Sequence, residues 1–340
     1  MDHSLIIEEV LARPQEISWL PWAVQYFFFI GIAACAALYG CVLHWRNRDL
    51  AKLEHLTLLI ALTCAITAPL ALTADLHQTA RFWHFYAYPT PWSWMPWGAL
   101  FLPLFTGVLG LWFLALQLKR FTQKSYRVTK WLALASALLA VGLLTYTGRE
   151  VSVVQARPVW FSYAFPVVMF LSAFHTFFAL LVVSLRGEHR LPRKLAFAQL
   201  WTLGLLALVI LFWVTGDTLS GVAIRDWLAV SLSARYYAAG WVALWILSIG
   251  ASCVAWCQPL TMPLRILQAL SAMALCWLMR WTLLIQVQTV PKFNAQFNPY
   301  SLPAGTDGWL AILGTFGLWI ALLIIVRETV NGLARRMQHG

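Results

Sequence analysis

The sequence contains few charged residues for its length. Charged side chains make up 11% of the 340 residues, hydrophobic side chains make up 61%, and the mean hydropathy is +0.71. Soluble domains carry roughly 25% charged residues. The shortage of charge therefore excludes a soluble globular fold and indicates a protein that lies in a membrane.

Cysteine and histidine are too sparse to build a redox centre. The six cysteines include no Cys-x-x-Cys motif, and Cys253 and Cys257, at helical spacing, offer two thiolates where a cluster needs four. Of the eight histidines only His175 lies well inside an apolar run, whereas a bis-His haem needs two facing imidazoles. We therefore expect no iron–sulfur cluster, haem or metal in this chain, and we expect His175 to be a packed core residue.

Long hydrophilic segments are missing as well. No stretch between apolar runs exceeds about two dozen residues, which is too short for a soluble catalytic domain. The first 18 residues are acidic and lack the basic segment of a signal peptide, so we expect the first apolar run to be an uncleaved anchor. Chemistry on a large substrate is expected on another polypeptide.

Nine apolar runs account for most of the chain. Each is close to the ~20 residues that cross a hydrocarbon core as a helix, and in lipid every backbone amide must be satisfied internally. The sequence thus predicts an all-α polytopic membrane protein. The runs cover residues 19–43, 56–72, 97–118, 131–146, 159–185, 195–214, 236–257, 264–285 and 309–326.

We expect the runs to pack as two four-helix bundles plus one additional C-terminal helix. Small residues in the first run, such as Gly31 and Ala34, would allow close helix approach. The expected divisions are an N-terminal tail at 1–18, a first bundle at 19–147 with an outer interfacial loop at 75–96, a second bundle at 159–287, a ninth helix at 309–326 and a tail at 327–340.

Basic residues predict the orientation. Of the 24 Lys and Arg residues, sixteen fall in alternate connections, seven fall on the opposite side, and Arg280 lies inside a run. The positive-inside rule then places the N-terminus in the periplasm and the C-terminus in the cytoplasm, which requires an odd number of spans. The net charge of +11 is therefore read as a topology signal and not as a nucleic-acid site.

The predicted outer face is rich in aromatic residues between Asp75 and Gly98. Three prolines, Pro89, Pro91 and Pro96, prevent a continuous helix through the second half of this segment. We interpret it as an amphipathic element in the headgroup layer. Asp75 needs a partner at the edge of the lipid, and Arg81 is one candidate.

Polar residues inside the runs lie at similar depth near this face. Gln25 is six residues into the first run and Arg280 is about five from the end of the eighth, so both lie roughly 8–9 Å below the outer surface. Tyr146 ends the fourth run near that level, before Arg149 and Glu150. An intramembrane arginine indicates a functional site, with snorkelling to the headgroups or pairing purely for packing as the alternatives. A quinone, which combines an apolar body with hydrogen-bonding oxygens, suits such a pocket.

Several motifs form a recognisable series: Tyr-Thr-Gly at 146–148, Arg-Pro-Val-Trp at 157–160, a proline at 166 and Phe-Leu-Ser-Ala at 170–173. This series resembles the signature of the polysulfide reductase membrane subunit family (NrfD/PsrC type). Asp75-Leu76 is similar to the family's Asp-Leu motif, and Leu278-Met279-Arg280 with Gln286 or Gln288 resembles a late element. Within the family, the length and the ninth run are most similar to members that serve tetrathionate reduction.

The resemblance implies a subunit of the bacterial inner membrane that oxidises quinol, menaquinol in particular, near the periplasmic face. Family members work beside a four-cluster ferredoxin-like iron–sulfur subunit and a molybdopterin catalytic subunit, and they generally bind no haem or metal. The partner sets the terminal acceptor, so tetrathionate, polysulfide and thiosulfate remain open.

The resemblance also implies residue roles. Tyr146 corresponds to the residue that binds the quinone ring, and Asp75 to the carboxylate of the family. Gln25 stands where some members use a histidine, whereas Arg149 and Glu150 replace apolar residues of many members. We expect Asp75 or Glu150 to accept the quinol protons and a nearby arginine, Arg149 or Arg280, to hold the carboxylates ionised. The predicted catalytic residues are Asp75, Glu150 and Arg149, and the predicted quinol-binding residues are Tyr146, Gln25, Arg280, Arg81 and Trp160.

Three other functions stay open. A secondary transporter would explain prolines within the runs, but transporters bind near the midplane, and here the polar residues gather at one mouth. A haem-b quinol dehydrogenase would show a haem spectrum. A purely structural anchor would be insensitive to inhibitors of a quinone site.

Overall fold

The computed structural model is all-helical over the residues that it describes, which are 17–46, 50–122, 127–185, 190–292, 297–298 and 300–339. Nine helices within these ranges are long and apolar enough to cross a membrane, which confirms the predicted all-α polytopic class. The predicted tail at 1–18 lies outside the described residues apart from its last two. The spanning helices are α1 (Pro21–Arg46), α2 (Ala51–Asp75), α4 (Met95–Thr122), α5 (Val128–Ser152), α6 (Ala164–Ser184), α7 (Arg190–Thr215), α9 (Leu232–Cys257), α10 (Met262–Leu284) and α11 (Trp309–His339).

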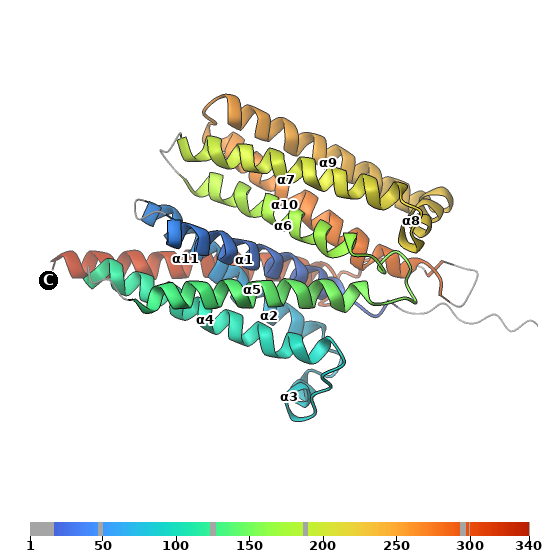
Figure 1. Ribbon diagram of the computed structural model, residues 1–340, viewed down its shortest axis with the longest axis horizontal. Helices are drawn as coiled ribbons and strands as arrows, with labels where there is room; N and C mark the ends of the chain where they lie inside the picture. The colour runs from blue at the N-terminus through green and yellow to red at the C-terminus, as the bar shows by residue number, and fades with distance from the viewer. Residues whose placement is uncertain are drawn as a thin grey trace, which may run out of the picture.

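The spanning helices pack as two groups of four with α11 beside the first (Figure 1). The first group contains α1, α2, α4 and α5, and the second contains α6, α7, α9 and α10. Helix α1 also contacts α6 and α10, so it joins the two groups. A Cβ on Gly31 of α1 would lie 2.9 Å from Nη2 of Arg280 and 3.2 Å from Cβ of Ala173, so the close approach requires glycine.

Four short elements complete the described chain: η2 (Thr79–Arg81), α3 (His84–Ala87), α8 (Leu219–Val230) and η3 (Gln286–Thr289). Helix α8 was not predicted because it is too short to span a membrane and produces no long apolar run. Its N-terminus is capped by Thr218, whose side chain accepts a hydrogen bond from the Gly221 N–H at 3.1 Å. We call the end of the molecule that carries α8, on the right in Figure 1, the α8 end.

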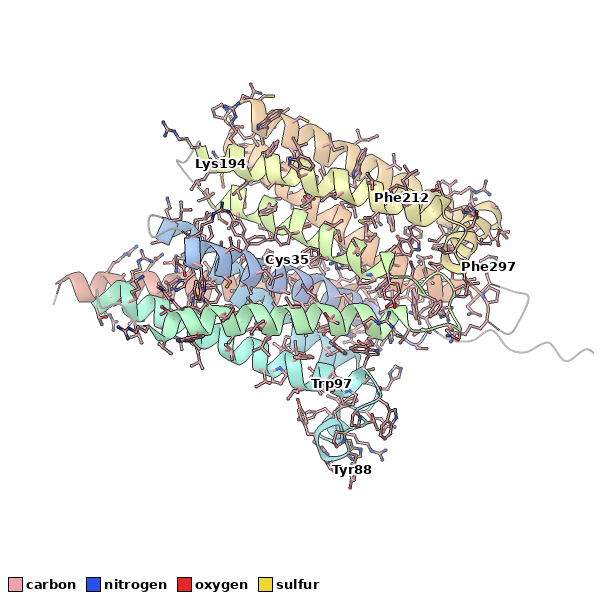
Figure 2. All side chains as sticks on the ribbon, in the orientation of Figure 1. Cys35, Tyr88, Trp97, Lys194, Phe212 and Phe297 are labelled. Atoms are coloured by element: carbon pink, nitrogen blue, oxygen red, sulfur yellow. The ribbon has the colours of Figure 1, made fainter. Side chains whose placement is uncertain are left out.

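The aromatic segment between α2 and α4 contains two short helices, η2 and α3, joined by turns. Helix α3 stands away from the first group of helices in Figure 1, and Figure 2 shows Tyr88 and Trp97 on this projection. Tyr88 is 71% exposed and Trp92 is 85% exposed. The indole N–H of Trp97 donates to the Pro91 carbonyl at 3.0 Å, which folds the segment back on itself.

Most helices extend a few residues beyond the predicted runs, and three boundaries change the interpretation. Helix α5 continues past Tyr146 to Ser152, because charged residues end an apolar run without ending a helix. Helix α6 begins at Ala164 and not at 159, because the preceding residues form turns, in which the Trp160 N–H donates to the Arg157 carbonyl at 2.9 Å and the Phe161 N–H to the Pro158 carbonyl at 3.1 Å. Helix α11 continues beyond 326 to His339, so the predicted tail at 327–340 is helical over the described residues.

The connection between α5 and α6 is fastened to the end of α10. Arg157 donates from Nη1 to the carbonyls of Val287 at 3.1 Å and Val290 at 3.0 Å, and its guanidinium lies 5.6 Å from the Trp160 ring centroid. Burial lowers the pKa of Arg157. The indole N–H of Trp160 donates to the Leu283 carbonyl at 2.5 Å. One short segment therefore ties the first group of helices to the second.

Replacing Arg157 with leucine should destabilise the protein. The substitution leaves two buried carbonyls without their donor, and hydrogen bonds to charged groups contribute roughly 1.5–3 kcal/mol. Thermal unfolding in mild detergent measures the loss. Arg193→Leu, at an exposed position of α7, is the matched control and should change the midpoint little. Equal midpoints for the two variants would contradict the assigned role.

Candidate functional site

Tyr146 and Glu150 share one face of α5 at the α8 end. The two residues are four apart, and because α5 continues to Ser152 they lie one turn apart on the same side of the helix. The Tyr146 side chain is 2% exposed, and the Glu150 carboxyl group lies beside its hydroxyl. The extra turn of α5 thus brings together a phenol and a carboxyl group that a helix ending at Tyr146 would leave apart.

Two further residues fix the Tyr146 ring. Tyr26 of α1 is 1% exposed and lies beside Tyr146, and its own hydroxyl has no hydrogen bond of good geometry within the described chain. Gly98 of α4 lies against the ring, because a Cβ at that position would overlap the Tyr146 Cζ, Cε1 and hydroxyl atoms. The phenol is therefore held between α1, α4 and α5.

Asp75 reaches this site from the end of α2. Its Oδ1 accepts a hydrogen bond of 3.1 Å from the Leu20 N–H, directly before the first residue of α1. A carboxylate at a helix N-terminus is stabilised by the unpaired N–H groups and the helix dipole. Asp75 also interacts electrostatically with Glu150. We call Tyr26, Asp75, Tyr146 and Glu150 the tyrosine–carboxylate cluster.

The side-chain amide of Gln25 is not available to a ligand. Its Nε2 donates to the Ile312 carbonyl on α11 at 3.0 Å, and its Oε1 accepts from the Trp277 indole on α10 at 3.1 Å. The side chain is fully buried. Both ends of the amide are therefore occupied by contacts that join α1, α10 and α11.

Arg280 is 1% exposed and does not snorkel to the surface. Its Nε donates to the Phe27 carbonyl, its Nη2 to the Met169 carbonyl and its Nη1 to the Ser172 hydroxyl, each at 3.0 Å. Nη1 also bonds the Cys276 carbonyl at 3.0 Å. All these partners are neutral. The positive guanidinium is therefore stabilised by the negative ends of carbonyl and hydroxyl dipoles and not by a carboxylate.

A small cavity borders Arg280, between α1, α5, α6 and α10. Its volume is about 20 Å³, and its lining includes Thr147, Gly148 and Met169. Room for about one water molecule needs roughly 10–15 Å³. This cavity therefore holds about one water molecule and is far too small for a quinone ring.

The remaining predicted site residues point elsewhere. The Arg149 guanidinium lies 5.0 Å from the Tyr163 ring centroid and donates to the Ser152 hydroxyl at 3.4 Å. Arg81 is exposed on η2 and forms no ion pair with Asp75 in the described ranges. No arginine of the described chain is ion-paired with either carboxylate of the cluster.

Trp160 has a structural environment. Beyond its bond to the Leu283 carbonyl, its ring stacks on Trp19 with centroids 5.2 Å apart. Trp19 precedes α1, and Gln288 holds the same segment by accepting from the Ser18 N–H at 3.0 Å and the Trp19 N–H at 3.3 Å. Trp160 and Gln288 therefore position the chain that enters α1.

Tyr26 and Gly98 were not among the predicted site residues. Tyr26 stands in an apolar run next to three phenylalanines, where a lone tyrosine resembles any other core ring. The hydroxyl of Tyr26 was the one feature of the sequence that could have indicated a role in the site. Gly98 starts a helix with no motif of its own, so its close contact with Tyr146 follows only from the packing of α4 on α5.

No group of three or more His, Cys, Asp or Glu side chains within the described ranges lies close enough to hold a metal ion. His175 is 1% exposed, and neither of its ring nitrogens has a hydrogen-bond partner in that part of the chain. A larger cavity, of about 440 Å³, lies among α7, α8, α9 and α10, and none of the predicted site residues lines it.

The sequence profile described as "Polysulphide reductase, NrfD" matches residues 9–292, which extend from before α1 through η3 and leave α11 outside. The C subunit of tetrathionate reductase from Salmonella typhimurium is 75% identical over 341 aligned residues, covering 100% of both chains. The C subunit of selenate reductase from Mesobacillus selenatarsenatis is 25% identical over 191 residues, covering 46% of this chain and 45% of that protein.

Gly98→Ala should displace the Tyr146 ring and lower stability. The added methyl group overlaps ring atoms, and overpacking a core costs roughly 1–3 kcal/mol. Gly107→Ala on the same helix is the matched control, because a Cβ there meets no atom within 4 Å. The control should keep or raise the midpoint of thermal unfolding. If both variants unfold at the same temperature as the parent protein, Gly98 does not hold the ring in place.

Proposed function

The chain belongs to the polysulphide reductase NrfD family, and from this premise we propose that it is the quinol-oxidising membrane subunit of a respiratory reductase. It takes electrons from quinol, menaquinol in particular, and passes them to a four-cluster iron–sulfur subunit that serves a molybdopterin catalytic subunit. The terminal reduction takes place on the partner. Identity of 75% over the full length of a relative named for tetrathionate reductase supports tetrathionate as the acceptor.

The chain is a multi-pass membrane protein, and we place it in the bacterial cytoplasmic membrane. The excess of basic residues in alternate connections supports a periplasmic N-terminus and a cytoplasmic C-terminus. In this orientation the α8 end faces the periplasm. The tyrosine–carboxylate cluster then lies close to the outer headgroups, where both a lipid-soluble quinol and a peripheral partner subunit have access.

The single observation that carries the proposal is the cluster itself. Oxidation of a quinol to a quinone removes two electrons and two protons, so a site needs groups that bind phenolic oxygens and groups that take protons. Tyr146 and Tyr26 supply hydroxyls, and Glu150 and Asp75 supply carboxyl groups without a paired arginine. These groups meet at the ends of α1, α2 and α5.

The reaction follows from this arrangement. One quinol hydroxyl bonds to Tyr146, and of the two protons that oxidation releases, one passes to Glu150, which lies beside that tyrosine, and the other to Asp75. Asp75, the last residue of α2, exchanges protons with the aqueous side. Both electrons leave to the iron–sulfur subunit, and the quinone departs into the lipid. Because protons and electrons leave on the same side, this step moves no net charge across the membrane.

Gln25, Arg280 and Trp160 act in this scheme as positioning residues. Arg280 fixes α1 through the Phe27 carbonyl, next to Tyr26, and Gln25 fixes the opposite side of the same turn. Trp160 holds the entry to α1 through Trp19. Arg81 is exposed and Arg149 is half-buried at the rim, where their positive charge favours an acidic surface of the partner subunit.

Tyr146→Phe should lower quinol-dependent tetrathionate reduction at least about tenfold, since loss of a positioned proton-transfer group typically costs 10²–10⁴. Reduction driven by a soluble viologen dye, which supplies the partner subunits directly, should not change. Tyr236→Phe, at a 69% exposed site on α9, is the matched control. Unchanged quinol turnover in Tyr146→Phe would refute a quinone role for this residue and favour a structural anchor.

Asp75→Asn and Glu150→Gln separate proton transfer from structure. Asparagine keeps an acceptor oxygen for the Leu20 N–H, and glutamine keeps one for Tyr146, but neither takes up a proton. Both variants should assemble normally and turn over quinol at least about tenfold more slowly. Asp75→Leu should in addition lose stability, by roughly 0.5–2 kcal/mol as for other lost helix caps. Normal turnover in Asp75→Asn would assign this carboxylate to capping alone.

A further inference from the structure

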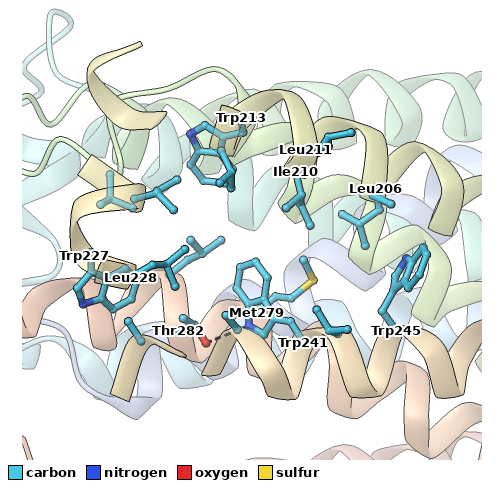
Figure 3. A pocket seen from close by; sticks show the side chains of 18 of the residues that line it. Leu206, Ile210, Leu211, Trp213, Trp227, Leu228, Trp241, Trp245, Met279 and Thr282 are labelled. Carbon is cyan, nitrogen blue, oxygen red and sulfur yellow. Dashed lines mark hydrogen bonds between the residues drawn. The ribbon is translucent and has the colours of Figure 1, made fainter. Parts of the chain in front are cut away.

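The cavity of about 440 Å³ in the second group of helices has the size of a binding site (Figure 3). Helices α7, α9 and α10 form its walls, and residues of α8 line it at the α8 end. Small-molecule sites in proteins typically measure about 300–1,000 Å³. The tyrosine–carboxylate cluster contributes no residue to it.

The walls of the cavity are almost entirely apolar. Its lining is hydrophobic except for Thr215 and Thr282, whose hydroxyls already donate to carbonyls of their own helices at 2.7 and 2.8 Å. A buried water needs two to four polar partners. The cavity therefore lacks the polar partners that an ordered water needs, and its walls suit a hydrocarbon.

The cavity opens toward lipid over the depth of one leaflet. Leu211 and Val242, which both line it, are 61% and 56% exposed on a membrane-spanning surface. The lining residues of α7 run from Leu206 to Thr215, a rise of about 14 Å. Half of a hydrocarbon core of ~30 Å is about the same length. A single acyl chain of the adjacent leaflet therefore matches the cavity in length.

One polar group at the α8 end lacks a partner. Three of the four tryptophans that line the cavity donate their indole N–H to protein oxygens, namely Trp213, Trp241 and Trp245. Trp227 of α8 is only 8% exposed, and its N–H has no hydrogen-bond partner within the described ranges. The ester carbonyls of a phospholipid lie at the headgroup end of its acyl chains, which is the end where Trp227 sits.

A positively charged side chain lies on α9 near the α8 end of the cavity. Arg235, in the first turn of α9, is exposed and precedes Ala238 by three residues and Val242 by seven, so it shares their face of the helix. Helical side chains lean toward the N-terminus of their helix, which here is the α8 end. The guanidinium is thus directed to the headgroup layer beside the cavity, where it can pair with a phosphate.

We propose that this cavity binds one acyl chain of an anionic phospholipid, whose ester oxygen accepts from Trp227 and whose phosphate pairs with Arg235. An isoprenoid tail of quinol would also fill an apolar channel, but a tail carries no oxygen for Trp227. The bound lipid fills the space between α7 and α9, whose facing side chains leave the cavity open.

Native mass spectrometry of the full chain, purified in mild detergent with the subunits that accompany it, tests the proposal. Ala238→Trp should fill the cavity and abolish retention of a phosphatidylglycerol-type lipid. Ala239→Trp, on the exposed face of the same turn, should retain it. Equal retention by both variants would overturn the site. Retention of quinone by the parent protein and its loss only in Ala238→Trp would overturn the choice of a phospholipid.

Two smaller substitutions and a probe test the polar contacts. Trp227→Phe and Arg235→Gln should each lower lipid retention about fivefold, the factor for one cation or one hydrogen bond at a membrane surface. Trp201→Phe, 61% exposed on α7, and Arg193→Gln, at the opposite end of α7, should have no effect. In the unmodified protein, a phosphatidylglycerol with a photoreactive acyl chain should label peptides of α7, α9 and α10. Labelling confined to other helices would overturn the proposal whatever the variants do.

Discussion

The arrangement of the helices depends on a buried cation that has no carboxylate partner among the described residues. Arg280 lies in the membrane, where a guanidinium cannot find water, so its five N–H groups must be satisfied by protein atoms. They bond to oxygens on α1 and α6 as well as on α10, which carries the arginine itself. The arginine therefore holds both groups of helices together at one depth, and Gly31 must lack a side chain to admit it.

The N-terminus of α1 is held by a second set of contacts, and one of them involves a proposed catalytic residue. Asp75 accepts from the Leu20 N–H, while Gln288 accepts from the two residues before it. The carboxyl group that we propose to exchange protons is thus also the one that caps α1. A proton on Asp75 weakens this cap, because the stabilisation of a helix N-terminus depends on negative charge. Proton transfer at the site and the position of Tyr26, on the same helix, are therefore linked.

The two groups of helices differ in what they leave unpaired. The first ends in Tyr26, Tyr146 and two carboxyl groups, a polar set suited to proton and electron transfer. The second encloses a cavity with hydrophobic walls and a single unpaired indole N–H. The connection between α5 and α6 lies between them: Trp160 bonds to the Leu283 carbonyl, and Val159 and Leu283 line the cavity.

The sequence by itself determined the nine spanning helices, because lipid requires continuous apolar helices and leaves few other solutions. It also predicted roles for Tyr146 and Asp75 from their resemblance to family motifs and for Glu150 from its position after Tyr146, and these roles stay predictions. It could not show that α5 continues beyond its apolar run. This continuation places Glu150 one helical turn from Tyr146, on the same face. Nor could it distinguish Arg280 and Gln25, whose polar groups are occupied within the protein, from residues that face a substrate. Tyr26, Gly98, α8 and the cavity followed only from tertiary structure, because contacts between distant helices decide which polar atoms are satisfied and which stay available.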